Sequence, residues 1–487
     1  MSLGEQIRRN TAWVALGGVL RRFGAFLVGI VLARLLVPED FGLLVTVQVF
    51  TGVASYLASG GMSEALVRSE QASARDFHVV FTVQLATGVL IYALFFAAAP
   101  WFAAWYDQPI YADLFKVSAL GFVLRPFVNV PRARLKRDMR FKAISTLGLV
   151  CQVFGSGSSI LMAWLGYGVW SLVLGGLIGS AVNALLFARA TRWTPRLAYD
   201  PGITRRLGSY GIKTTLVNII LHFRDQTANF IIGRQFGAAS LGLYNKGDSL
   251  AAMPMETLAR SLYPPVFRAL AKVQQDLNES QYIFLRSSAL LAVYAWPLFT
   301  GLIWLAAPFV EVVYSAKWLG AVLPLQILAC RGYLRTLGNL SGAVSAARNR
   351  LGREIWIQLE GLAILAIACL IGVHWGLTGV AVGVACAWAY SSLRMALFAA
   401  AVLRVRARRL ARGLLPAIGL NLGLHGWLAL ASFALETLRP QASPLLRLLG
   451  LGLSGTLLYG LAFLYLPIPS LATEAARWKR RLGLDHT

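Results

Sequence analysis

Arginine side chains within apolar sequence are the residues of this chain whose type and position could support chemistry. Twelve Lys and Arg residues fall inside apolar stretches, which hold only four acids. Because an arginine at the centre of a bilayer costs at least ~2.5–3.5 kcal/mol, we expect most of them to face a hydrated cavity. The guanidinium group binds phosphate through a planar and often bidentate fork. The pattern therefore predicts a positively charged cavity that binds a phosphorylated guest.

The strongest candidates lie in the middle of apolar stretches, where no interface is within reach. Arg21 and Arg22 share the first stretch, and Arg331 and Arg335 share the tenth. We predict that the anion-binding set is Arg21, Arg22, Arg224, Arg260, Arg331 and Arg335. The candidates for ion coupling are Asp225, His222 and Glu256. Two alternatives stay open, because Glu256 and Arg260 are spaced to form a structural pair and His222 could simply pack.

Motifs of known catalytic chemistry are missing from the sequence. It contains no GxxxxGK[ST] loop, no HExxH and no GxSxG. The four cysteines all lie in apolar runs without CxxC spacing, so neither a disulfide nor a metal site is expected. We therefore expect a protein that is not an enzyme and that uses no cofactor or metal.

The composition identifies the solvent of these helices. Of 487 residues, 57% are hydrophobic and only 14% are charged, against roughly 25% charged in soluble domains. Such a chain needs lipid, in which a spanning helix takes about 20 apolar residues. The net charge of +25 is compatible with binding to nucleic acid. That reading is disfavoured because the basic residues punctuate the apolar segments instead of clustering on one soluble face.

Apolar segments recur along the whole chain and predict its fold class. They must be helices, because open strands would leave backbone groups unpaired in lipid. The sequence thus predicts an all-α polytopic membrane protein of about fourteen transmembrane helices. These lie at 12–34, 41–63, 78–99, 110–130, 144–164, 168–188, 211–233, 242–267, 284–306, 321–345, 355–374, 377–402, 414–435 and 445–466.

The distribution of Lys and Arg predicts the orientation. Thirty basic residues fall in one set of alternating connections, including six in PRARLKRDMRFK at 131–142. The other set holds only Arg34, Arg234, Lys317 and Arg439. By the positive-inside rule, both termini are predicted to be cytoplasmic.

An internal repeat predicts the domain organisation. ARLLVPEDFGLL at 33–44 aligns without gaps on GRQFGAASLGLY at 233–244, so that Gly42 matches Gly242. Weaker matches at offsets of 210 and 208 follow in order, although chance similarity of apolar sequence remains an alternative. Two parallel six-helix lobes are predicted, with domains at 1–190, 191–403 and 404–487, the last holding two extra helices and a basic tail.

These segments resemble a known family. ARLLVPEDFGLL, PRARLKRDMRFK, NFIIGRQFGAASLGLYNKGDSL and APFVEVVYSAKWLGAVLPLQIL, in this order, are similar to the Wzx-type polysaccharide exporters of the multidrug/oligosaccharidyl-lipid/polysaccharide (MOP) superfamily. The resemblance implies two lobes forming a V in the bacterial inner membrane. It also implies the flipping of undecaprenyl-diphosphate-linked oligosaccharides by alternating access, commonly driven by ion gradients. Cationic cavity positions carried over by the resemblance are Arg21, Arg22 and Arg260.

Three other functions remain to be weighed. A peptidoglycan-precursor flippase would bind a similar diphosphate lipid. A multidrug or cation extruder of the same superfamily should carry acids in its cavity, and a membrane polymerase or ligase should have a sizeable external domain. The expected partners are the lipid-linked oligosaccharide and membrane lipids, together with polymerase and chain-length regulator proteins, and no nucleic acid.

Overall fold

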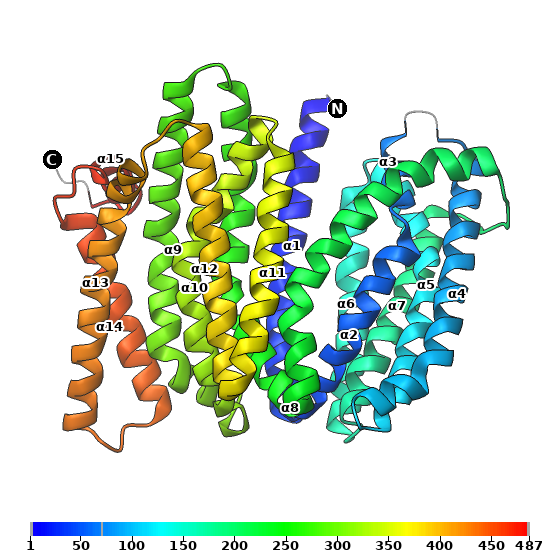
Figure 1. The fold of residues 1–487 in the computed structure, drawn as a ribbon, viewed down its shortest axis with the longest axis horizontal. Coiled ribbons are helices and arrows are strands. Elements are labelled where there is room, and N and C mark those ends of the chain that lie inside the picture. The colour runs from blue at the N-terminus through cyan, green and yellow to red at the C-terminus, as the bar shows by residue number, and fades with distance from the viewer. Residues whose placement is uncertain (1–2, 70–71, 485–487) are drawn as a thin grey trace. The chain divides into compact units, whose positions relative to one another are not determined.

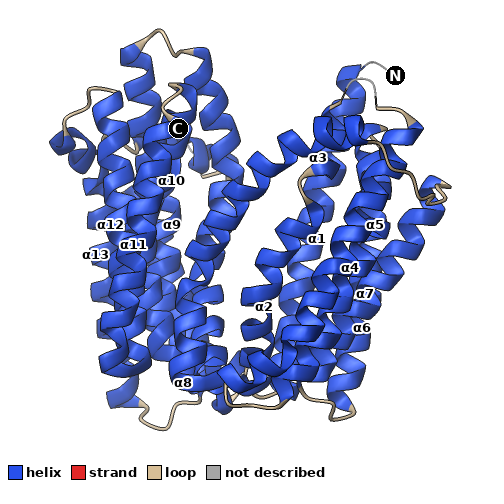
Figure 2. Cartoon of the chain, turned by 45° about the vertical axis from the view of Figure 1, so that its right-hand side comes forward, coloured by secondary structure: helices blue, strands red, loops and turns tan. Residues whose placement is uncertain are grey.

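The fold is described from a computed structural model, and its elements are α-helices joined by short connections (Figures 1 and 2). It describes residues 3–69 and 72–484, without the side chains of 3–12, 14–15, 210, 213–214, 259–260 and 351. Within these residues no strand occurs. The predicted all-α polytopic membrane fold is confirmed.

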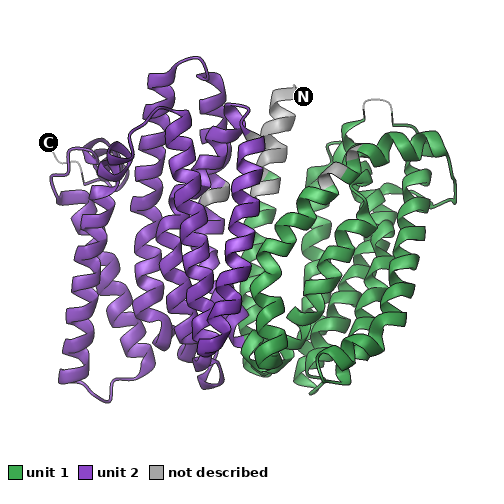
Figure 3. Cartoon of the chain, viewed as in Figure 1, with its two compact units in different colours: residues 1–242 green, residues 243–487 purple. Residues whose placement is uncertain are grey.

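The chain forms two compact units, residues 1–242 and 243–487 (Figure 3). Unit 1 contains α1 (Leu3–Leu35), α2 (Pro38–Ser59), α3 (Met62–Arg68), α4 (Ala74–Trp105), α5 (Ile110–Arg137), α6 (Phe141–Trp164), α7 (Val169–Thr191) and the part of α8 (Pro201–Lys272) that ends at Gly242. Unit 2 contains the rest of α8, α9 (Leu277–Val313), η1 (Ala316–Ala321), α10 (Val322–Ala347), α11 (Leu351–Gly372), η2 (Val373–Trp375), α12 (Gly376–Val402), α13 (Ala407–Leu438), α14 (Pro444–Tyr465) and α15 (Ala472–Arg481). The predicted domain boundary at 190 and 191 stays a prediction.

Long helices coincide with the predicted spans. Helix α8 is broken at Gly237, whose φ of 77° and ψ of 179° suit glycine alone. Counting its halves separately, the described residues form fourteen long helical segments. Ten stretches are long and apolar enough to cross a membrane, and one of these, Gly352–Val402, holds both α11 and α12. The other long segments are the two halves of α8 and α10, which carry four of the six predicted arginines.

Aromatic packing forms much of the core of unit 1. Phe102 of α4 stacks on Phe115 of α5 with ring centroids 4.0 Å apart, and Phe50 of α2 meets Phe102 edge-on at 4.9 Å. Tyr111 is buried and donates to Thr46 Oγ1 over 3.1 Å. These contacts fix α2, α4 and α5 against one another, because offset and edge-to-face pairs add to the burial of apolar area.

Two matched glycines of the internal repeat make a reciprocal contact within unit 1. A Cβ atom on Gly42 would lie 1.7 Å from the carbonyl oxygen of Ala238, and one on Gly242 would lie 1.8 Å from that of Pro38. Pro38 matches Ala238, just as Gly42 matches Gly242, at an offset of 200. Each of the two aligned segments thus presents its glycine to the matching position of the other segment.

A second close approach lies at the other end of the first half of α8. Gly60 and Gly61 form the turn between α2 and α3 with positive φ angles of 53° and 61°. A Cβ on Gly211 of α8 would lie 1.9 Å from the Gly60 carbonyl oxygen. Helix α8 therefore touches the α2 region backbone to backbone at two levels.

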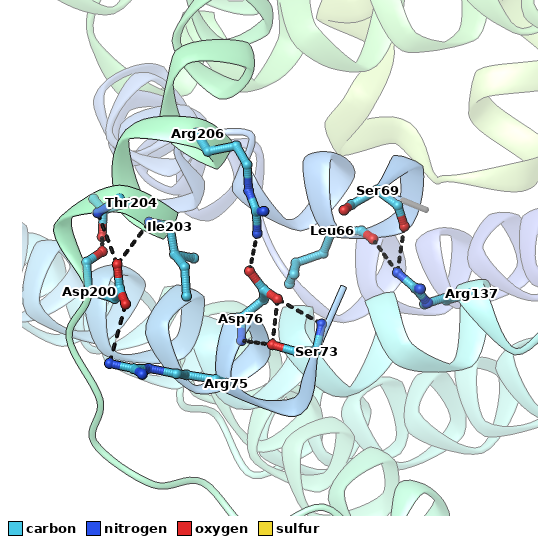
Figure 4. Close-up of polar contacts among 11 residues, drawn as sticks. Leu66, Ser69, Ser73, Arg75, Asp76, Arg137, Asp200, Ile203, Thr204 and Arg206 are labelled. Carbon is cyan, nitrogen blue, oxygen red and sulfur yellow. Dashed lines mark hydrogen bonds and ion pairs between the residues drawn. The ribbon is translucent and has the colours of Figure 1, made fainter. Parts of the chain in front are cut away.

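Charged side chains hold the start of α8 to the start of α4 (Figure 4). The Asp200 carboxylate accepts hydrogen bonds of 2.9 and 3.1 Å from two backbone N–H groups of the first turn of α8, and it pairs with Arg75 at 3.2 Å. The buried carboxylate of Asp76 pairs with Arg206 of α8 and accepts from the backbone N–H and the hydroxyl of Ser73, each at 2.7 Å. An acid at a helix start satisfies otherwise unpaired N–H groups.

In unit 2 a buried polar network joins α13 to α9 and α10. Trp304 Nε1 donates to His425 Nδ1 over 2.9 Å, and His425 Nε2 lies 3.1 Å from the Tyr333 hydroxyl. Thr300 Oγ1 donates to Asn421 Oδ1 over 3.0 Å. Because unpaired polar groups are costly away from water, these bonds fix α13, which lies outside the predicted repeat, to the packed helices.

Candidate functional site

One face of α5 carries the polar side chains around which the candidate site is built. Arg125, Asn129, Arg132 and Lys136 follow one another at spacings of four, three and four residues, which places them on the same side of a helix. At 1.5 Å per residue the stripe is about 16 Å long. We call these four residues the α5 stripe.

The α2–α8 cavity lies on one side of this stripe and has a volume of about 620 Å³. Small polar residues of α2 and amide side chains of α8 form its walls, together with three residues of α3 and five residues of α5. Its lining comprises Gln48, Thr51, Gly52, Ser55, Tyr56, Ser59, Gly61, Ser63, Glu64, Val67, Arg125, Asn129, Arg132, Ala133, Lys136, Thr215, Asn218, His222 and Gln226.

Two further cavities surround the same helix. The α6–α7 cavity, of about 630 Å³, lies among α1, α5, α6 and α7 and shares Arg132 and Lys136 with the first. The α2–α7 cavity, of about 420 Å³, shares Arg125 and Asn129 with the first and Asn183 with the second. The α5 stripe is therefore common to three neighbouring hollows.

The charge of these cavities is strongly unbalanced. Among the described residues that line them, the cations are Arg21, Arg125, Arg132 and Lys136, and the single acid is Glu64, in the α2–α8 cavity. Clefts lined by one sign of charge concentrate counter-ions. The arrangement can attract and hold anionic groups.

The arginines of the stripe keep most of their hydrogen-bonding capacity. Arg125 Nη1 donates to the Ser55 carbonyl over 3.4 Å. The Arg132 guanidinium lies 5.1 Å from the ring centroid of Phe187. Within the described part of the chain, Arg132 Nε and Asn183 Oδ1 are buried without a hydrogen-bond partner. Since nearly all buried polar atoms are paired, these two atoms are suited to form hydrogen bonds with a group bound in the cavity.

Two of the predicted residues lie in these cavities. Arg21 lines the α6–α7 cavity, and His222 lines the α2–α8 cavity with Nε2 2.9 Å from the Val49 carbonyl oxygen. Gly52 makes room for the imidazole ring, because a Cβ there would lie 2.1 Å from His222 Cε1. Arg22 is exposed and is not part of these three linings.

Arg224 lies next to Asp225, and the two side chains approach each other. Neighbouring residues of a helix point about 100° apart, yet Arg224 Nε lies 3.6 Å from Asp225 Oδ1. The Arg224 side chain is largely buried, whereas that of Asp225 is 58% exposed. Asp225, a predicted residue for ion coupling, is therefore accessible from outside the protein.

The other predicted arginines belong to unit 2. Arg331 is 5% exposed and forms an ion pair with Asp248, which leaves it less free to bind a guest. Arg335 stacks 4.9 Å from the ring centroid of Trp388. Glu256 is exposed, and the side chain of Arg260 lies outside the described residues. The roles of all these residues stay predictions.

Sequence reasoning assigned Arg132 and Lys136 to a cytoplasmic connection, but α5 continues through them to Arg137. The extension is helical because Val130, Ala133 and Leu135 are buried against the unit. A regular spacing of polar residues through the end of the span was the signal that could have found the stripe.

Comparison with known proteins decides the family. Residues 31–323, more than half of the chain, match the profile of a family described as polysaccharide biosynthesis protein. The chain belongs to the polysaccharide biosynthesis protein family. One similar protein is the lipopolysaccharide biosynthesis protein WzxC of Escherichia coli (strain K12). It is 26% identical to this chain over 379 residues, which cover 76% of each chain.

Solved structures share the fold of this polysaccharide biosynthesis protein. The lipid II flippase MurJ in an inward closed conformation superposes with a TM-score of 0.71 at 15% identity, over 96% of this chain and 99% of MurJ. An inward-facing multidrug resistance MATE transporter of the MOP superfamily gives a TM-score of 0.63 at 17% identity, over 79% and 94% of the chains. The family member thus shares the all-α fold of these two solved structures.

Proposed function

We propose that this chain is a flippase that moves undecaprenyl-diphosphate-linked oligosaccharide repeat units across the bacterial inner membrane by alternating access. The units would feed the assembly of a surface polysaccharide such as O-antigen, capsule or exopolysaccharide. Membership of the polysaccharide biosynthesis family supports this role. The observation that carries it is a set of polar cavities inside a membrane protein, whose described lining residues include four Lys and Arg side chains and a single acid.

The chemistry of the cavities matches the head group of such a lipid. Arg125, Arg132 and Lys136 offer charge-assisted hydrogen bonds to a diphosphate. The hydroxyl and amide side chains of α2 and α8 offer partners for sugar hydroxyls, each of which would otherwise cost roughly 4–8 kcal/mol in hydrocarbon. The lipid tail stays in the bilayer, so only the polar part needs the protein.

The remaining cations and acids have subsidiary roles in the proposal. Arg21 extends the positive charge into the α6–α7 cavity. Among the candidates for ion coupling, His222 is the one that lies in a described cavity. It is the proposed residue for coupling transport to a proton gradient. Both termini are placed on the cytoplasmic side by the excess of basic residues there.

A peptidoglycan-precursor flippase is the second candidate, because the fold match with the lipid II flippase covers nearly the whole chain. Its guest also carries a diphosphate, so the cavity alone does not separate the two. A multidrug or cation extruder is disfavoured by the single acid among the lining residues. The proposed role is transport, with no catalytic step.

Binding of undecaprenyl-diphosphate-linked oligosaccharide to the purified protein in nanodiscs tests the proposal. Arg132→Gln should weaken binding about 10- to 150-fold, the effect of losing a charged hydrogen bond of about 1.5–3 kcal/mol. Arg134→Gln is the matched control, since Arg134 is exposed on another face of α5 and carries the same charge. Equal affinities of the Arg132→Gln variant and the unchanged protein would refute the assignment. Preference for lipid II over glycan-linked lipids would favour the second candidate.

A further inference from the structure

The short helix α15 follows the last long helix of the chain, and Figure 1 shows it at the end of unit 2 where α14 ends and α13 begins. Leu471 and Ala475 are buried against the unit. The Trp478 indole N–H donates to the Tyr294 hydroxyl over 2.8 Å, and this hydroxyl donates to Glu474 Oε1 over 3.1 Å. These contacts fix α15 to α9.

The neighbours of α15 lie at the level where the long helices leave the lipid. Helix α14 is apolar enough to cross a membrane and ends at Tyr465. The ring centroid of Tyr465 lies 4.6 Å from the Lys479 ammonium group of α15. On α9, Tyr294 marks the same level, because its ring centroid lies 6.1 Å from that of Phe463. Aromatic side chains at the ends of membrane spans lie among the lipid head groups, so α15 lies in that layer.

One face of α15 is apolar, and the protein covers only half of it. Leu471, Ala475, Trp478 and Leu482 are spaced by four, three and four residues, which places them on one side of the helix. The first two are buried, whereas Trp478 is 36% and Leu482 is 56% exposed. An apolar helix face that lies in the head-group layer is covered by lipid. The exposed half of the face is therefore suited to contact lipid.

Basic side chains flank this apolar face. At 100° per residue, Lys479 and Arg481 lie on either side of it. Lys479 lies over the Tyr465 ring, and the Arg481 guanidinium lies 5.8 Å from the ring centroid of Trp478. Long basic side chains at an interface extend their charge toward the head groups. The charged residues of α15 are Glu474, Arg477, Lys479, Arg480 and Arg481.

Residues 403–413, which lead into α13, add to the charge at this end of unit 2. Leu410 and Leu471 belong to the same apolar cluster, so this segment and α15 pack on the same part of the unit. The segment holds no acid. Clusters of four to eight Lys and Arg residues next to a membrane helix attract anionic lipids. The exposed arginines of the segment are Arg404, Arg406, Arg408, Arg409 and Arg412.

We propose that α15 and residues 403–413 form a binding site for an anionic phospholipid in the leaflet around the end of α14. Lys479 and Arg481 bind the phosphate group, and Trp478 and Leu482 contact the glycerol backbone and the first part of the acyl chains. A zwitterionic head group carries its own cation and therefore competes poorly for these charges. The site lies outside the three cavities around α5 and does not depend on the identity of the cargo.

Native mass spectrometry of the delipidated full chain in a neutral detergent measures the affinity for the first bound phospholipid. Phosphatidylglycerol carries a net negative charge and phosphatidylcholine carries none, so the ratio of the two affinities reports the effect of charge. The unchanged protein should bind phosphatidylglycerol at least about 30-fold more tightly, as expected for two basic side chains that contribute about fivefold each. Lys479→Gln/Arg481→Gln should remove most of this preference.

Arg268→Gln/Lys272→Gln is the matched control, because it removes the same charge from exposed positions at the end of α8. Helix α9 begins at Leu277, directly after α8, and Tyr294 follows 17 residues later. The control positions therefore lie about 25 Å along α9 from the level of α15. The control variant should keep the preference for phosphatidylglycerol within about twofold of the unchanged protein.

A charge-conserving variant guards against misfolding of α15. Lys479→Arg/Arg481→Lys should keep the preference, and its loss there would overturn the inference. Equal affinities of the unchanged protein for both lipids, or equal losses of preference in the α15 and α8 double variants, would also overturn it. The cargo is absent from these measurements. Failure to bind undecaprenyl-diphosphate-linked oligosaccharide, with an intact lipid preference, would refute the proposed function and leave this inference standing.

Discussion

The reciprocal glycine contact of the repeat allows a quantitative test. In Gly42→Ala the new Cβ would lie 1.7 Å from the Ala238 carbonyl oxygen, whereas ordinary contacts begin at 3.4 Å. The backbones of α2 and α8 must therefore separate by about 1.5 Å or more, because neither atom belongs to a flexible side chain. Overpacking of this kind costs about 1–3 kcal/mol.

The repeat adds a symmetry condition to this prediction. Gly242→Ala brings its Cβ to 1.8 Å from the Pro38 carbonyl oxygen. Because the two contacts are nearly equal, the two variants should be destabilised by similar amounts. Thermal unfolding of the purified protein in detergent, followed by circular dichroism, measures both losses.

Gly29→Ala is the matched control, since nothing lies within 4 Å of a Cβ at Gly29 of α1. Its melting temperature should be unchanged or slightly higher, because alanine favours a helix by about 1 kcal/mol over glycine. Melting of Gly42→Ala at the temperature of the unchanged protein would refute the tight contact. A large difference between Gly42→Ala and Gly242→Ala would refute its reciprocity.

Other contacts give further predictions. Asp76→Asn should lower the stability by about 1.5–3 kcal/mol, because Arg206 and the two donors of Ser73 lose a charged acceptor. Asp113→Asn at an exposed site should leave the melting temperature unchanged. Gly52→Ala and His222→Asn should each slow transport into vesicles, because the first displaces the imidazole ring and the second removes it. The double variant should therefore be no slower than either single variant. Additive losses of the transport rate would contradict this. His425→Phe should destabilise unit 2 by about 1–3 kcal/mol in thermal unfolding, because the half-buried indole N–H of Trp304 loses its acceptor. An unchanged melting curve would argue against the network.

The helices of this fold are predictable from the sequence because lipid leaves the backbone few options. Fourteen apolar segments predict the long helical segments closely, including the separate halves of α8. The break itself requires a glycine, and Gly237 lies within the repeat segment that the sequence aligns. Hydropathy and the internal repeat are therefore the sequence features that predict the long helices and the position of the break in α8.

The site is less predictable, because it depends on which residues meet in three dimensions. Arg331 looks like a cavity residue in the sequence, yet it pairs with Asp248, 83 positions away. Arg132 looks like a loop residue because basic residues near a span end are counted as cytoplasmic. Only the packing of Ala133 and Leu135 shows that its helix continues. Of the residues predicted from the sequence, the structure places Arg21 and His222 in the three cavities.

The three cavities share one helix face, and this has an evolutionary consequence. The charges between Arg125 and Lys136 occupy a segment of twelve residues, while the walls that surround them come from six other helices. A few codon changes in this segment could alter the preferred charge of the cargo without disturbing the scaffold. Exporters that serve chemically different polymers could therefore diverge by exchange of this short segment, and grafting it between relatives would transfer the preference.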